Sequence, residues 1–67
     1  MNAPEKLREW MGGFTPKLRQ SEVAERLAVT EARLSYWLSG KRQPNLKEAV
    51  AIDKLTFGRV PARDWVA

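Results

Sequence analysis

The chain has 67 residues, a net charge of +4 and a sequence pI near 10.0. It contains neither Cys nor His, which excludes disulfides and thiolate metal sites and removes the usual general base. No apolar run approaches the ~18 residues of a membrane span, and the N-terminus lacks the apolar core of a signal peptide. We therefore expect one small cytosolic domain that is not an enzyme, needs no metal or cofactor, and buries only about 60% of its unfolded surface.

The basic charge agrees with a nucleic-acid partner without establishing one. The twelve Lys and Arg residues are spread along the chain, and no polybasic run indicates an anchor on a membrane surface. The three Trp, two Phe and one Tyr are expected to supply much of the core area.

The spacing of the apolar residues in 1–13 predicts a first helix. Pro4 fits its first turn, where a missing N–H costs nothing, and the two glycines at 12–13 end it. The apolar stripe that is expected to face the core consists of Leu7, Trp10 and Met11.

The start of the second helix is ambiguous, although its apolar spacing indicates a helix over about residues 20–27. Thr15 and Pro16 fit either a turn or the cap and first residue of a longer helix. Arg19 has no side-chain oxygen to cap a helix that starts at residue 20, so we favour the earlier start. Nearby, Phe14 and Leu18 are expected to cover the core.

A third helix is predicted over residues 31–39. Thr30 supplies its N-cap, and Gly40 can take the positive φ that stops it. Leu34, Trp37 and Leu38 share one face, while Ala32 and Tyr36 point the opposite way, with Arg33 and Ser35 on the flanks. That outer face either enters a DNA major groove or is the solvated face of an ordinary small helical domain.

A fourth helix is predicted after the basic loop Gly40–Asn45, from a capping box of Asn45 and Glu48 to about Leu55. Pro61 is expected to open a final helical turn that Trp65 fastens to the core. The residues of the fourth helix that are expected to point mostly inward are Leu46, Ala49, Val50 and Ile52.

The stretch Gln20–Gly40 resembles the helix-turn-helix of the Cro/CI (XRE-type) phage repressors. In that pattern a Gln opens the second helix, an Ala follows one turn later, and the recognition helix ends in Trp-x-x-Gly. One departure is Ala28, where the family usually has Gly, and a left-handed turn there costs about 1 kcal/mol. The matching residues are Gln20, Ala24, Thr30, Trp37, Gly40, Lys41, Arg42 and Pro44.

The end of the chain resembles the small YdaS-like and Cro-like phage regulators. Those proteins continue past their fourth helix with an Ile-acidic pair, a Thr-x-Gly-x-Val turn and a short Asp-Leu segment. The corresponding residues are Ile52, Asp53, Thr56, Gly58, Val60, Asp64 and Trp65, with Trp in place of Leu. The two resemblances together span roughly residues 20–66.

These resemblances imply an all-α domain over residues 1–67, a small bundle of four or five helices of the lambda-repressor-like type. The helix over 31–39 would enter the major groove, and the helix over 20–27 would cross the DNA backbone. The implied base-contacting residues are Glu31, Ala32, Arg33 and Tyr36, with a phosphate as the alternative target of Arg33. The implied phosphate-contacting residues are Gln20, Ser39, Lys41 and Arg42. Trp37 is expected in the core.

The implied function is that of a prokaryotic or phage transcriptional regulator, a repressor of its own or a neighbouring promoter. It would bind double-stranded DNA as a homodimer on palindromic half-sites, with Phe57, Val60 and Trp65 either forming the dimer surface or buried within the monomer. A chain of this length has no room for a ligand-binding domain. Two alternatives stay open: an antitoxin-type module that binds a small protein partner, and an excisionase-like protein, although the loop before Asn45 leads into a helix rather than a wing.

Overall fold

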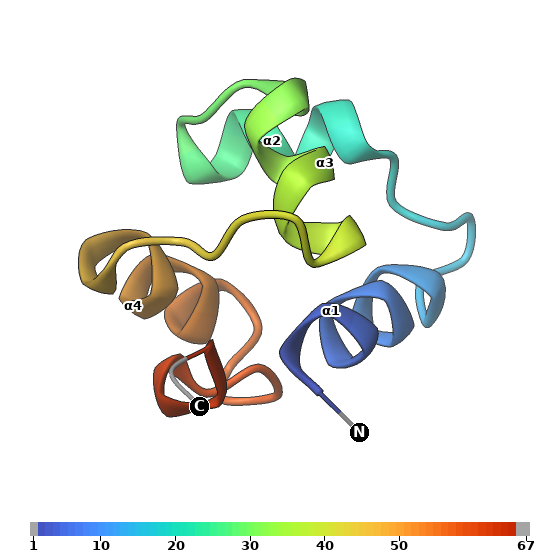
Figure 1. Cartoon of the computed structure of the whole chain (residues 1–67). Coiled ribbons are helices and arrows are strands. Elements are labelled where there is room, and N and C mark those ends of the chain that lie inside the picture. Colours follow the sequence, from blue (N-terminus) through green and yellow to red (C-terminus); the bar gives the residue numbers. More distant parts are fainter. Residues whose placement is uncertain (1, 66–67) are drawn as a thin grey trace.

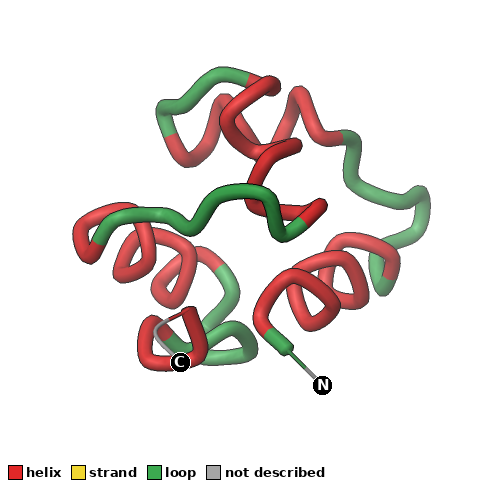
Figure 2. The backbone as a smooth tube through the Cα atoms, in the orientation of Figure 1, coloured by secondary structure: helices red, strands yellow, loops and turns green. Residues whose placement is uncertain are grey.

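The computed structural model describes residues 2–65, and every regular element in that range is helical (Figures 1 and 2). This confirms the predicted all-α bundle. No helix among these residues has both the length and the apolar character needed to cross a membrane. The elements in chain order are α1 (Ala3–Gly12), α2 (Gln20–Leu27), α3 (Glu31–Ser39), α4 (Leu46–Leu55) and the short 3-10 helix η1 (Ala62–Trp65).

Helix α3 lies near the middle of the view in Figure 1 and packs against α1 and α2, whereas α4 packs against α2 and η1. Its three large apolar residues are buried, and Trp37 is the largest fully buried side chain. Trp37 is therefore a core residue, as predicted. The buried apolar residues are Ala3, Leu7, Met11, Val23, Ala24, Leu34, Trp37, Leu38, Ala49, Ile52, Val60 and Trp65.

The predicted N-caps are present. The Thr30 hydroxyl accepts the Arg33 N–H at 3.1 Å, and the Asn45 side chain accepts the Glu48 N–H at 2.8 Å. Glu48 completes the capping box, because its Oε1 accepts the Asn45 N–H at 2.9 Å. The Asn2 side chain caps α1 by accepting the Glu5 N–H. This cap was not predicted from the sequence.

Helix α2 begins at Gln20, so the expectation of an earlier start was wrong. Segment 13–19 folds back onto α1, where the Leu18 N–H donates to the Met11 carbonyl at 3.2 Å. The Arg19 N–H is satisfied by the Glu22 carboxylate at 3.1 Å. Reverse capping by Glu22 thus lets the helix start without a capping side chain at residue 19.

Three helices end in the same hydrogen-bonded turn, in which a residue with left-handed backbone follows the helix. Ala28 has φ 59°, as its predicted turn requires, and Gly40 has φ 78°. Phe57 occupies the same position after α4, with φ 54°. In each turn the next residue donates its N–H five residues back: Val29 to Ala24, Lys41 to Tyr36, and Gly58 to Asp53.

The expectation for α4 was partly wrong, because Leu46 is 77% exposed and Val50 is 38% exposed. Ala49 and Ile52 are buried as predicted. Leu46 is the first residue of α4, at the end of the helix that lies at the edge of the fold (Figure 1). Val50 lies about 100° around the helix from Ala49 and so leaves the buried face.

The aromatic residues contribute less to the core than expected. Trp37 and Trp65 are buried, but Phe14 is 41% exposed, Tyr36 44% and Phe57 93%. Phe14 meets Trp10 edge-on, with 4.9 Å between the ring centroids, and so only borders the core. Leu18 does pack against the core.

Val60 and Trp65 belong to the monomer core, so of the two alternatives for these residues burial within the monomer is the one observed. The buried Thr56 holds this end of the chain, because its hydroxyl donates to the Ile52 carbonyl at 2.9 Å and accepts the Val60 N–H at 3.1 Å. An ion pair between Lys6 and Asp64 joins α1 to η1. Of the three candidate residues, Phe57 alone stays accessible.

Candidate DNA-binding site

The outward face of α3 follows from what its other face buries. Leu34, Trp37 and Leu38 point inward and are almost fully covered. The opposite side has no large aliphatic residue to bury, and its residues Glu31, Ala32, Ser35 and Tyr36 are all exposed. The structure therefore has the helix orientation that the sequence predicted, with small and hydrogen-bonding residues facing out.

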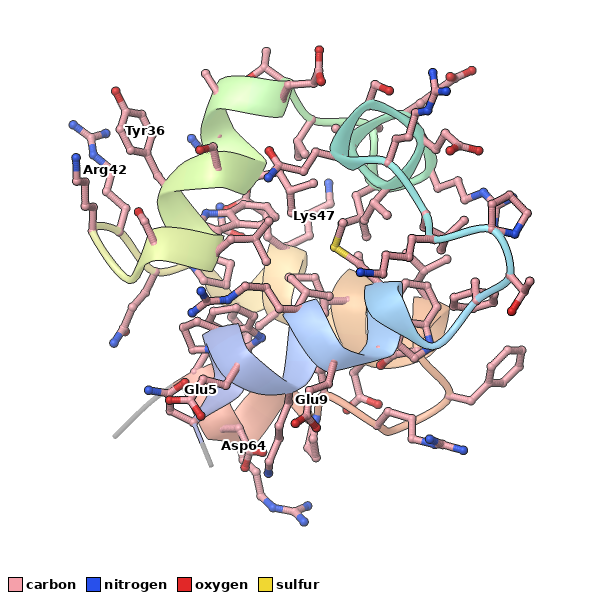
Figure 3. All side chains as sticks on the ribbon, turned by 90° about the vertical axis from the view of Figure 1, so that its right-hand side faces the viewer. Glu5, Glu9, Tyr36, Arg42, Lys47 and Asp64 are labelled. Atoms are coloured by element: carbon pink, nitrogen blue, oxygen red, sulfur yellow. The ribbon has the colours of Figure 1, made fainter. Side chains whose placement is uncertain are left out.

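Tyr36 and Arg42 form one unit at the end of this face. The guanidinium carbon of Arg42 lies 5.4 Å from the centroid of the Tyr36 ring, within the range of a cation–π contact. The turn at Gly40 brings the two together, because both Lys41 and Arg42 donate backbone N–H groups to the Tyr36 carbonyl, at 3.1 and 3.3 Å. Figure 3 shows the two side chains side by side at the surface.

Arg33 is held by α4. Its Nη2 donates to Glu48 Oε1 at 2.9 Å, and its Nε donates to the other carboxylate oxygen. The guanidinium carbon also lies 5.8 Å from the centroid of the Trp37 ring. Glu48 Oε1 thus serves two donors, the capping Asn45 N–H and Arg33, so the start of α4 is tied directly to α3.

This arrangement lowers the pKa of Glu48. The hydrogen bond from the Arg33 side chain is the main cause; partial burial opposes it, while the Asn45 N–H and the positive charge of Arg33 add to it. The same hydrogen bond raises the pKa of Arg33. Both groups are therefore charged at neutral pH.

A shallow hollow of about 410 Å³ lies between α3 and the loop that follows it. Its cations are Arg33 and Arg42, and its apolar surface comes from Ala32 and the two aromatic rings of α3. The residues that line it are Thr30, Ala32, Arg33, Tyr36, Trp37, Arg42 and Gln43. An apolar hollow between two cations suits the sugar, methyl and phosphate surface of a DNA groove.

The structure brings some predicted site residues together and leaves others apart. Ala32, Arg33, Tyr36 and Arg42 all line the hollow. Glu31 lies in the first turn of α3. Gln20 is exposed at the first position of a different helix, α2.

The remaining predicted residues follow α3. The Ser39 hydroxyl donates to the Tyr36 carbonyl at 3.1 Å, which leaves its oxygen free to accept. Lys41 is exposed on the loop and forms no ion pair with another residue in the range 2–65.

Gln43 was not among the predicted site residues, although it lines the hollow. Its amide can both donate and accept hydrogen bonds, as adenine recognition requires. Its position directly after Lys41 and Arg42, in the loop that follows the helix, was the available signal in the sequence.

A comparison with protein-family models matches residues 16–58, more than half of the chain, to the helix-turn-helix family HTH_3 of XRE type. The match spans α2, α3 and α4 and so contains the whole hollow. Neither the curated proteins nor the solved structures include a match.

Proposed function

Because the chain belongs to the XRE-type helix-turn-helix family of DNA-binding regulators, we propose that it is a sequence-specific transcriptional regulator that inserts α3 into the major groove. The observation that carries the proposal is the outward face of α3. Its apolar side is fully used by the core, and the exposed Tyr36 is backed by the cation of Arg42. The DNA major groove is wide enough to admit an α-helix, so α3 can enter it with this face toward the base edges.

The proposed base contacts come from the exposed face of α3. Glu31 accepts a hydrogen bond from a cytosine amino group, and Ala32 contacts a thymine methyl. Tyr36 packs on a methyl group or bonds through its hydroxyl to a base edge or a phosphate. Arg33 holds Glu48 through its Nε and Nη2 groups in the structure, and it reaches a guanine or a phosphate through its remaining donors on Nη1 or by leaving Glu48.

The proposed phosphate contacts surround this face. Gln20 approaches one strand from the start of α2, while Ser39, Lys41 and Arg42 approach the backbone beside the end of α3. These contacts set the register and much of the affinity, and they carry little sequence information.

We further propose that the protein represses its own or a neighbouring promoter in a prokaryotic or phage-infected cell, acting on the DNA in the cytoplasm. Occupation of a promoter by a bound domain is sufficient for repression. A homodimer is the functional form, because one domain with a single recognition helix spans only a few base pairs.

The test is fluorescence anisotropy on the DNA upstream of the protein's own coding sequence, compared with scrambled DNA of the same length. The wild type should prefer the upstream DNA, and Tyr36→Ala should narrow that preference by about 1–3 kcal/mol. Val50→Ala is the control, because it trims another exposed apolar side chain that lies outside the α3 hollow. Equal weak binding to both DNAs, unchanged by Tyr36→Ala, would contradict the role of α3 and favour the alternative of a protein partner.

A further inference from the structure

Phe57 is placed where neither the backbone nor the core favours a phenylalanine. Its φ of 54° is left-handed, a conformation that costs a residue with a Cβ about 1–2 kcal/mol and costs glycine nothing. Its side chain is 93% exposed, so burial within the monomer offsets none of this cost. A strained and exposed aromatic residue indicates a contact outside the monomer.

A hollow of about 290 Å³ adjoins Phe57, formed by α1, the start of the α1–α2 connection and the turn after α4. Phe14 and the partly buried Trp10 give it an aromatic wall, with their rings edge to face. The residues that line it are Glu9, Trp10, Gly13, Phe14, Thr56, Phe57 and Arg59. This surface therefore carries both the protruding ring of Phe57 and a recess whose aromatic wall can contact such a ring.

The same surface carries one free charge of each sign. Glu9 and Arg59 both line the hollow, and neither forms an ion pair with any residue in the range 2–65. The neighbouring Lys6 is already paired with Asp64. A surface with an anion and a cation, a projection and a recess is complementary to itself across a two-fold axis.

From this self-complementarity we propose that the Phe57 surface pairs two copies of this chain. Phe57 of one copy enters the aromatic recess of the other, and Glu9 of each copy meets Arg59 of its partner. A standard interface takes about 800 Å² from each partner, and this domain exposes 4748 Å² in all. We expect a weak pair, with a dissociation constant on the order of 100 µM, because the aromatic centre is small.

The pairing surface lies away from the proposed DNA-binding face. In Figure 3 the turn after α4 emerges at the right of the molecule, Glu9 projects from α1 below the centre, and Tyr36 and Arg42 lie at the upper left. Two paired copies therefore keep both α3 faces uncovered. This inference rests on the homodimer of the proposed function, but pairing is measured without DNA, so its failure is distinguishable from a failure of α3 to recognise DNA.

Sedimentation equilibrium without DNA, from micromolar to millimolar protein, tests the pairing. The wild type should shift from monomer to dimer mass over this range, and Phe57→Gly should raise the dissociation constant at least about tenfold. Phe57→Gly also removes the left-handed strain, so its melting temperature should equal or exceed that of the wild type. A loss of pairing therefore cannot be ascribed to unfolding.

Charge reversal tests the predicted geometry. Glu9→Arg and Arg59→Glu should each weaken self-association, because each places like charges across both halves of the interface. An equimolar mixture of the two variants should pair again, since every contact in the mixed dimer joins opposite charges. A wild type that stays monomeric at millimolar concentration, a Phe57→Gly protein that pairs normally, or a mixture that does not recover would each overturn the proposal.

Discussion

Two arginines beside the recognition face are held in different ways. Arg42 stacks on Tyr36 without a carboxylate partner in the range 2–65. Arg33 shares Glu48 with the cap of α4. A DNA phosphate or base must therefore compete with a carboxylate for the Nε and Nη2 groups of Arg33, whereas it can approach Arg42 directly. This difference decides which of the two side chains is ready for a DNA contact.

The Glu48 carboxylate should make stability depend on pH in the acid range. Its folded pKa lies below its ordinary value, so the unfolded chain binds more protons there. The contribution is fully present above the unfolded pKa of about 4.3 and is lost as the pH falls through the lowered folded pKa. Glu48→Gln keeps a capping acceptor but has no carboxylate to protonate. Its melting temperature should therefore fall less between neutral and acid pH than that of the wild type. An equal fall in both proteins would contradict this role of the Arg33 pair.

The indole of Trp65 is buried in the core, but its N–H makes no hydrogen bond with residues 2–65. The side chain is 3% exposed. Trp65→Phe should therefore lower the free energy of unfolding only slightly, because it removes no hydrogen bond seen in the structure. Trp65→Ala should lower it by about 3–5 kcal/mol. Urea unfolding followed by circular dichroism measures both, and a large loss in Trp65→Phe would show that the N–H is bonded in solution.

The helices of this domain are bounded by local signals that do not all come from the expected residue types. Ala28 and Phe57 occupy left-handed positions where glycine is the usual residue. In both turns the backbone hydrogen bonds that close the helix are present. The turns that end α2 and α4 thus keep their hydrogen bonds in spite of the strain that a Cβ adds at these two positions.

Substitution of Ala28 by glycine should stabilise the domain. The gain should be about 1 kcal/mol, which raises the melting temperature by about 4–8 °C in a domain of this size. The same chemical change at Ala51, inside α4, should destabilise by about 1 kcal/mol. Differential scanning calorimetry of the two variants compares one substitution in two backbone conformations. A fall in melting temperature for Ala28→Gly would show that the Ala28 methyl is needed for packing.

The molecule as a whole has two different surfaces. The hollow beside α3 carries two cations and the aromatic ring of Tyr36. The hollow beside Phe57 carries one free charge of each sign around three aromatic rings. The first suits a polyanion, whereas the second suits a copy of itself. The net charge of +4 is therefore less informative than its distribution.

Salt dependence should distinguish the two surfaces. If Lys41 contacts a phosphate, Lys41→Gln should reduce the slope of log K against log salt by about 0.9. Arg59→Gln removes the same charge from the Phe57 surface and should leave the slope unchanged. Both slopes can be measured by anisotropy titrations on a fragment of the upstream DNA too short for two copies, at protein concentrations too low for pairing. Equal reductions in the two variants would mean that only the net charge matters.

The sequence by itself determined the parts of this protein that depend on near neighbours. Thr30 and Asn45 were recognised as caps because each role uses backbone groups a few residues away, whereas the left-handed turn at Ala28 was implied by the family resemblance. The outward face of α3 was also predictable, since three large apolar residues at helical spacing leave one side for solvent. Together these local features were sufficient to predict an all-helical bundle.

Only the tertiary structure decided what depends on distant partners. Leu46 and Phe57 are apolar yet exposed, whereas Val60 and Trp65 are buried; pattern alone could not separate these cases, because it does not show where the core ends. The engagement of Arg33 by Glu48, fifteen residues further along the chain, depends on where packing against α2 and η1 places the start of α4. The placement of Gln43 beside Tyr36 likewise depends on the path of a loop. Helical periodicity specifies which side of a helix is apolar, but burial and charge pairing are decided by what the fold places against it.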